Sequence, residues 1–71
     1  MKRFGEKLRR LRQGRSLTMR ELASHLDIQS HSHFVDMENG RSLPSIELLV
    51  KIADYFGVTT DQLLRDDQEI E

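Results

Sequence analysis

The stretch SHSHFVDMENG, residues 30–40, determines how this chain folds. Phe34 and Met37 lie three residues apart, which is the spacing expected on the buried side of a helix. Ser30 is a preferred residue type for a helix N-cap, and the Asn-Gly pair at the end of the stretch tolerates the positive φ at which helices stop. We therefore predict a short helix here. Its outward side would carry His31, Ser32, Val35 and Asp36.

The residues before this stretch predict two further helices. Apolar residues recur at helical spacing between positions 4 and 11, and Gly14 marks the end of that first helix. Thr18 and Glu21 have the spacing of a capping box, so a second helix begins there and continues toward residue 26. Residues 27–29 would then form a tight turn that joins the second helix to the third.

The residues after the stretch 30–40 predict two more helices. Ser45 is a suitable N-cap for a fourth helix, which Gly57 ends. Thr59 and Gln62 form a second capping box and open a short fifth helix, with Leu63 and Leu64 on its apolar side. The inward stripe predicted for the fourth helix consists of Ile46, Leu49, Ile52, Ala53 and Phe56.

The chain is therefore predicted to be all-α, because no segment shows the two-residue alternation of a strand. Its 71 residues suffice for one small domain, which we assign to residues 1–65. The acidic tail, residues 66–71, is expected to be disordered. Two short helices joined by a tight turn, as predicted for the second and third, have the layout of a helix-turn-helix motif.

Composition limits the class of protein. The chain has no cysteine, so neither a disulfide nor a cysteine-based zinc site stabilises it. No apolar run approaches the roughly 18 residues that a membrane span needs, so no membrane partner is expected. The first ten residues lack the apolar region of a signal peptide. We therefore expect a soluble, cytoplasmic protein.

Charge is distributed unevenly along the chain. The formal net charge is −1, yet residues 1–20 hold eight Lys or Arg side chains and one acid, and residues 66–71 hold four acids. Such a basic beginning favours a polyanionic partner. Within it, Lys7 and Arg9 are expected to lie on a solvated helix face rather than in a contact.

Metal binding and catalysis are both disfavoured. His31 and His33 lie two residues apart, so a helix turns them about 200° from each other and one ion cannot bind both. His25 does not provide the i, i+4 spacing that a helical chelate needs. There is no cysteine nucleophile and no glycine-rich phosphate loop. We expect no metal, no cofactor and no enzymatic activity.

From Phe4 to Leu64 the chain resembles the Cro and phage-repressor type of helix-turn-helix domain, the XRE-like family. The matching pieces occur in order along the chain: LRRLRQGRSLT, ELASHL, ENGRSLPS, LLVKIADYFGV and TTDQLL. The resemblance implies a compact five-helix, lambda-repressor-like DNA-binding domain. In that fold the second and third helices form the helix-turn-helix motif, and the third enters the major groove of double-stranded DNA.

The resemblance also implies roles for single residues. A reading helix presents polar or small side chains near its N-terminus to base edges. The base-reading candidates are His31, Ser32, Val35 and Asp36. The candidates for phosphate contacts are Thr18, Arg20, His33, Asn39, Arg41 and Ser42. Arg12 and Glu38 match a structural salt bridge of the family, and the homodimer interface would involve Val58, Thr60, Asp61 and Leu64.

The chain departs from the family pattern in three places. The turn reads LDIQS, residues 26–30, which is one residue longer than usual and has Asp27 where glycine is common. Met19 stands where the family often has a glutamine that helps to hold a phosphate. Asp36 replaces a basic or amide residue, and an acid facing DNA is repelled by phosphates unless it accepts from a cytosine amino group.

Two functions from different classes are consistent with these residues. The first is a sequence-specific transcriptional regulator, a repressor that binds an inverted-repeat operator as a homodimer. The second is a protein-binding module, such as an antitoxin or anti-regulator, because XRE-like domains include both. The acidic tail and Asp36 would suit a protein partner.

Overall fold

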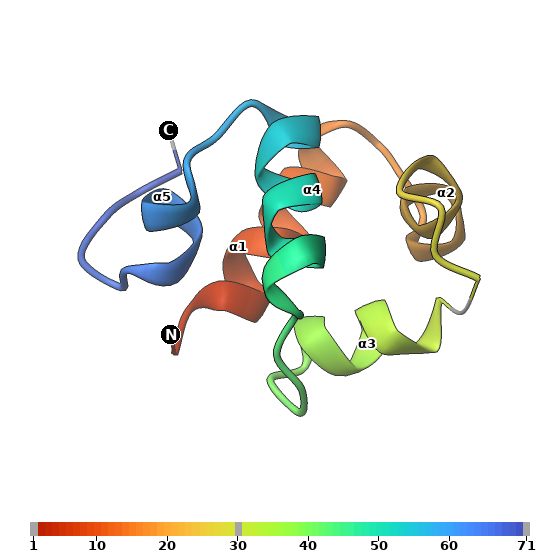
Figure 1. Ribbon diagram of the computed structural model, residues 1–71, viewed down its shortest axis with the longest axis horizontal. Helices are drawn as coiled ribbons and strands as arrows, with labels where there is room; N and C mark the ends of the chain where they lie inside the picture. The colour runs from red at the N-terminus through yellow and green to blue at the C-terminus, as the bar shows by residue number, and fades with distance from the viewer. Residues whose placement is uncertain (1, 30, 71) are drawn as a thin grey trace.

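The computed structural model describes residues 2–29 and 31–70, which form five α-helices and no strand (Figure 1). The helices are α1 (Phe4–Gly14), α2 (Met19–His25), α3 (Ser32–Glu38), α4 (Ile46–Phe56) and α5 (Thr60–Leu64). The all-α, five-helix fold predicted from the sequence is confirmed. Over the same residues, no helix combines the length and the apolar character needed to cross a bilayer.

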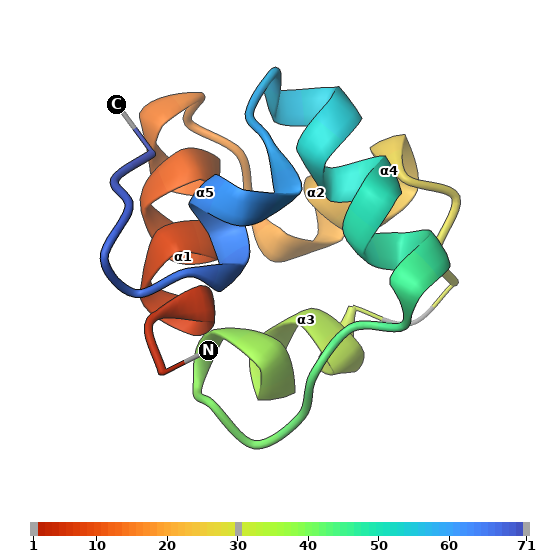
Figure 2. The same cartoon turned by 60° about the vertical axis from the view of Figure 1, so that its left-hand side comes forward.

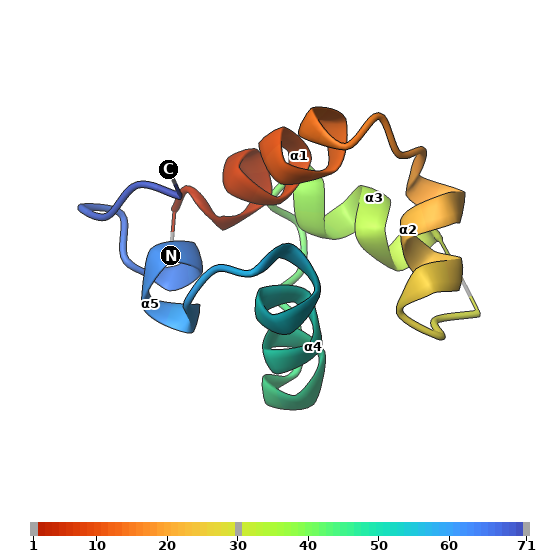
Figure 3. The ribbon, with the colours of Figure 1, turned by 90° about the horizontal axis from the view of Figure 1, so that it is seen from above.

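The helices are arranged around α1, which contacts both α3 and α5. In addition α2 packs against α3, and α4 packs against α5. Seen from the front and from above, α4 lies between α2 on one side and α5 on the other (Figures 1 and 3). The described chain measures 31 × 23 × 20 Å, so every helix reaches both the core and the surface.

One apolar core holds the helices together. Leu8, Leu22, Phe34, Met37 and Ile52 are fully buried in it. Burying such a side chain contributes roughly 1.5–3 kcal/mol, so these residues dominate the stability of the fold. The other buried apolar residues are Phe4, Ala23, Leu26, Leu48, Leu49, Ala53, Phe56 and Leu63.

The prediction for the inward side of α4 was wrong at one position. Ile46 is 83% exposed, whereas Leu48, which the predicted stripe omitted, is buried. Ile46 is the first residue of α4 and lies at the edge of its apolar arc, where no other helix covers it. Spacing alone therefore placed Ile46 inward, but the first turn of α4 extends beyond its neighbours.

Both predicted capping boxes are present. The Thr18 hydroxyl accepts from the Glu21 backbone N–H, and the Glu21 carboxylate accepts from the Thr18 N–H. This second hydrogen bond lowers the pKa of Glu21 below its ordinary value. Thr59 and Gln62 make the same reciprocal pair at the start of α5. The caps satisfy N–H groups that the first helical turn leaves unpaired.

The turn between α2 and α3 depends on Asp27. Its φ is +58°, a left-handed conformation that glycine adopts most easily and that Asp tolerates better than most residues. The N–H groups of Asp27 and Ile28 donate to the carbonyls of Ser24 and Ala23, which closes the end of α2. Asp27 therefore performs the role that the family usually gives to glycine.

The start of α3 differs from the sequence prediction. Ser30, the predicted N-cap, lies outside the described residues. The helix begins at Ser32, with His31 in the N-cap position and without a side-chain cap. The His31 carbonyl accepts from the N–H groups of Phe34 and Val35. After α3, Gly40 takes a φ of +78°, as predicted for the end of the helix.

Gly5 allows α1 and α3 to approach each other closely. A Cβ at this position would lie 2.5 Å from the Met37 carbonyl oxygen and 2.6 Å from that of Glu38. These are backbone atoms at the end of α3, so they cannot rotate away as a side chain would. The absence of a side chain at Gly5 therefore fixes how near the end of α3 lies to α1.

Lys7 does not lie on a solvated face, as predicted, but is fully buried. Its ammonium group donates to the carbonyl oxygens of Gln62, Arg65 and Gln68, each at 2.6 Å. An ammonium group has three N–H donors, so these three acceptors satisfy it completely. The whole Lys7 side chain is covered by the protein, and its charge is held where the chain turns back after α5.

The acidic segment after α5 folds back onto the start of α1, which differs from the disordered tail expected from the sequence. The Asp66 carboxylate accepts from the backbone N–H groups of Lys2 and Arg3, which lowers the pKa of Asp66. The Arg3 guanidinium pairs with Glu69 at 2.7 Å and lowers the pKa of Glu69. Basic and acidic ends of the chain thus neutralise each other in part.

Candidate nucleic-acid interface

The outward side of α3 carries the predicted base-reading residues. Phe34 and Met37 turn fully into the core, which directs the opposite side of the helix to solvent. On that side Ser32 is exposed, while His31, Val35 and Asp36 are half-buried. His33 is also half-buried and lies at the edge of this side, beside the buried arc. The structure therefore gathers the four candidates into one short surface.

Arg20 and His31 lie on either side of the turn that precedes α3. Together with Gln29 they line a shallow hollow of about 330 Å³. Arg20 is exposed on α2, so its guanidinium can reach an anion beside the start of α3. Thr18, two residues before Arg20 at the start of α2, already uses its hydroxyl as the N-cap, so it offers a phosphate mainly the adjacent backbone.

Asp36 and Arg41 are close to each other at the far end of α3. Arg41 Nη1 lies 3.7 Å from Asp36 Oδ1, and the Arg41 N–H donates to the Asp36 carbonyl at 2.8 Å. The Arg41 side chain is exposed and the Asp36 side chain is half-exposed, so the ion pair itself contributes little stability. Its consequence is positional: Asp36 holds Arg41 beside the outward side of α3.

Asn39 is oriented by a residue of α1. The Arg9 guanidinium donates to Asn39 Oδ1 at 3.3 Å. The carbonyl end of the amide is therefore turned toward Arg9, and its NH₂ end is the one presented outward. An NH₂ group is a donor, which is the polarity that a phosphate oxygen requires.

Ser42 is placed differently from the other phosphate-binding candidates. Its hydroxyl oxygen is covered by the protein and makes no hydrogen bond with any residue between 2 and 29 or 31 and 70. A buried hydroxyl without a partner costs roughly 1–3 kcal/mol. In this conformation a phosphate cannot reach Ser42 Oγ, so such a contact requires the side chain to rotate.

The structure brings Arg12 and Glu38 together, as the family resemblance implies. Arg12 Nε donates to Glu38 Oε2 at 2.8 Å, and Arg12 Nη2 donates to Glu38 Oε1 at 3.1 Å. The Glu38 side chain has no exposed surface, and its contact raises the pKa of Arg12. Arg12 also donates to the Leu17 carbonyl at 2.8 Å. The pair fastens α1 to the end of α3.

Arg9 belongs to the same cluster, although a solvated face was predicted for it. Its Nε lies 3.3 Å from Glu38 Oε1, in addition to its contact with Asn39. Arg9 and Arg12 are three residues apart, so they lie on one side of α1. That spacing was a signal in the sequence from which the second contact could have been predicted.

The predicted dimer residues near α5 expose little apolar surface. Val58 and Leu64 pack against the core, Thr60 is half-buried, and Asp61 is exposed. By contrast, the large hydrophobic side chains that are exposed in the described chain are Leu43, Ile46 and Val50. They belong to the loop before α4 and to its first two turns.

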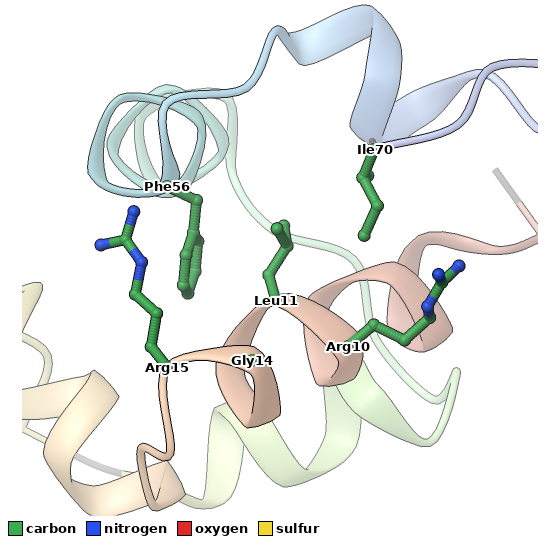
Figure 4. A pocket seen from close by; sticks show the side chains of 6 residues that line it. All are labelled: Arg10, Leu11, Gly14, Arg15, Phe56 and Ile70. Atoms are coloured by element: carbon green, nitrogen blue, oxygen red, sulfur yellow. The ribbon is translucent and has the colours of Figure 1, made fainter.

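A separate hollow of about 270 Å³ is formed by α1, the end of α4 and Ile70 (Figure 4). Leu11, Phe56 and Ile70 supply its apolar lining. The Arg15 guanidinium lies 5.0 Å from the centres of the Tyr55 and Phe56 rings, a cation–π contact that holds it against the protein. No residue of α2 or α3 contributes to this hollow, so it is separate from the candidate interface.

No group of three or more histidine or acidic side chains that could hold a metal ion occurs among the residues whose positions are described. His25 instead forms a hydrogen bond with the Tyr55 hydroxyl. His31 and His33 occupy different sides of the first turn of α3.

Similarity to known proteins agrees with this architecture. The family model described as a helix-turn-helix domain matches residues 3–66. The chain is 39% identical over 67 residues to the HTH-type transcriptional activator BcrR of Enterococcus faecalis, covering 94% of this chain and 32% of BcrR. It is 41% identical over 59 residues to the HTH-type transcriptional regulator DdrOP3 of Deinococcus deserti, covering 83% of this chain and 45% of DdrOP3.

The chain thus spans less than half the length of either of these relatives. The match of the family model nevertheless runs from the start of α1 to just beyond α5, and so includes every helix of the fold. The resemblance predicted from the sequence motifs is confirmed: this chain belongs to the helix-turn-helix domain family.

Proposed function

We propose that the chain binds double-stranded DNA as a homodimer and represses transcription from an inverted-repeat operator. The observation that carries this proposal is the outward side of α3, with Arg20 at one end and Arg41 at the other. An α-helix of this kind fits the major groove, and flanking cations bind the phosphates on either side of it. The names of the two relatives, both transcription regulators, support the regulation of transcription, which is the coarser part of this proposal.

We propose repression because DNA binding alone is sufficient for it. Occupying a site that polymerase must use requires only DNA binding, whereas activation requires a further productive contact. One relative is named an activator, so the direction of regulation needs its own test. A reporter gene placed behind the selected operator should be expressed less when the protein is present.

The protein-binding alternative receives less support from the tail than the sequence suggested. Asp66 and Glu69, two of its four acids, interact with Lys2 and Arg3 of the same chain. They are therefore occupied within the domain and do not form a free acidic surface for a partner.

The positioning role of the basic residues predicts a change in salt dependence. Arg20→Ala and Arg41→Ala should each weaken binding to every duplex, specific or not, because phosphates are present in all of them. Removing one phosphate-binding side chain should make the slope of log affinity against log salt shallower by about 1. Arg65→Ala is the matched control, since Arg65 is exposed beyond α5 and pairs with Asp67. An unchanged slope in both variants would remove these arginines from the interface.

The reading role of α3 predicts a change in sequence preference. His31→Ala and Ser32→Ala should each weaken operator binding by about 1–3 kcal/mol for every base that the side chain reads, and should relax the preference at discrete base pairs. Neither residue belongs to the buried core, so the melting temperature should stay close to that of the parent chain. Selection from random duplexes measures the preference. If the same consensus is recovered from all three proteins, these two side chains do not read bases.

A further inference from the structure

The exposed apolar surface of this domain is concentrated at one place. Leu43 is 61% exposed, Ile46 is 83% exposed and Val50 is 45% exposed. Ile46 and Val50 are four residues apart on α4 and so lie on the same side of it. Leu43 precedes Ile46 by three residues, a distance of at most about 10 Å along the chain. Hydrophobic residues that gather in this way, rather than singly, mark a surface that binds another protein.

The position of this apolar patch suits contact between two DNA-bound copies. The loop that follows α3 runs along the same edge of the domain as α3 itself and leads directly into the start of α4 (Figures 1 and 2). Arg41, a phosphate-binding candidate, lies in that loop, two residues before Leu43. The patch therefore borders the proposed DNA-binding side, whereas α5 lies away from α2 on the other side of α4 (Figures 1 and 3).

The charged residues beside the patch can pair with their counterparts on a second copy of the chain. Glu47 follows Ile46, and Lys51 follows Val50. Both are exposed, and neither has an ion-pair partner in the part of the chain that the structure describes. If two α4 helices pack antiparallel across a two-fold axis, Glu47 of each copy faces Lys51 of the other. A two-fold interface requires this kind of self-complementarity, because the same surface is used by both copies.

We infer that Leu43, Ile46 and Val50 form the homodimer contact, with α4 packed on α4 of a second copy, and that this contact assembles on DNA. The inference rests on the proposed DNA binding and locates its dimer at α4 instead of the α5 surface implied by the family resemblance. A stable interface buries about 800 Å² on each partner. Three partly exposed side chains provide less, so the free protein is monomeric and two adjacent half-sites supply the missing effective concentration.

The test compares binding to one half-site and to the full inverted repeat obtained by selection. The parent chain should be a monomer by sedimentation and should bind the full site with a cooperativity of about 5–150-fold. The double substitution Ile46→Gln with Val50→Gln should leave half-site affinity unchanged and abolish the cooperativity. The double substitution introduces no charge, so repulsion from DNA cannot account for a loss of cooperativity. Both residues are exposed, and glutamine favours a helix, so folding is preserved.

Two further sets of variants identify the surface. Glu47→Lys and Lys51→Glu should each reduce cooperativity, and combining them should restore it, because the facing charges are then exchanged on both copies. Thr60→Gln and Asp61→Asn, on the surface of α5, should leave it intact. Moving the half-sites apart by about 5 base pairs, half a helical turn, should abolish the cooperativity of the parent chain and of every variant.

Each alternative has its own result. Cooperativity that survives Ile46→Gln with Val50→Gln but disappears with the α5 variants overturns the inference and places the dimer at α5. Half-site binding by the parent chain without any cooperativity also overturns it, yet leaves the proposed DNA binding standing. Failure of the parent chain to select any duplex refutes the proposed function itself and the dimer with it.

Discussion

Replacing Glu38 by alanine should lower the free energy of unfolding by about 3–5 kcal/mol, because it removes the shared partner of two guanidinium groups. The Glu38 side chain has no exposed surface and contacts Arg12 at 2.8 Å and Arg9 at 3.3 Å. Arg12 is itself only 13% exposed, so water cannot fully replace the missing carboxylate. A domain of this size has a total stability of only about 4–10 kcal/mol, so the variant should be partly unfolded near 37 °C.

Urea denaturation followed by circular dichroism measures this change. Glu47→Ala is the matched control, since Glu47 is exposed in the first turn of α4 and its removal should cost less than about 1 kcal/mol. Adding Arg12→Met to Glu38→Ala should cost little more, because the unpaired cation is then removed as well. A midpoint for Glu38→Ala that matches the parent chain would show that solvent, and not Arg12, balances this carboxylate.

Replacing Lys7 by methionine should cost about 3 kcal/mol or more and should also release the segment after α5. Methionine has an unbranched side chain similar to that of lysine but leaves the carbonyls of Gln62, Arg65 and Gln68 without their common donor. Hydrogen bonds to a charged group contribute roughly 1.5–3 kcal/mol each, and water recovers part of this once the segment detaches. The destabilisation therefore has a local part, at residues 62–70, and a global part.

Hydrogen exchange separates the two parts of this effect. The N–H groups of Arg65 and Gln68, which donate to the carbonyls of Asp61 and Arg65, should lose protection in Lys7→Met before the core does. Lys7→Arg should not keep the protection of these N–H groups, since a planar guanidinium cannot direct donors at three carbonyls gathered around one point. Lys51→Met, at an exposed position of α4, is the control for removing a lysine. Protection at residues 65 and 68 equal to that of the parent chain would refute the role assigned to Lys7.

Local signals in the sequence predicted much of this fold. Thr18 with Glu21, and Thr59 with Gln62, act within one helical turn, so their pairing depends only on near neighbours. Gly40 and Gly57 end helices for reasons equally local, since each takes a positive φ. The five helices could therefore be predicted without knowing how they pack.

Contacts between distant residues could not be predicted in this way. Nothing around Lys7 indicates burial, because the acceptors that make burial favourable lie 55 to 61 residues later in the chain. Ile46 has the spacing of an inward residue, and only the positions of the other helices reveal that nothing covers it. At the candidate interface, the residues of α3 followed from its periodicity, whereas the orientation of Asn39 by Arg9 required the geometry of α1 against α3.

The contacts between the two ends of the chain have a consequence for the order of folding. Asp66 and Glu69 bind Lys2 and Arg3 across 63 to 66 residues, and Lys7 donates to the carbonyls of Gln62, Arg65 and Gln68. Contacts that close such long loops form late and slow the search for the native state. The first helix of the chain is thus completed by its last segment. A nascent chain that already contains α2, α3 and α4 can place α1 against α3 through Arg12 and Glu38, but it still lacks the residues after α5 that bind Arg3 and Lys7.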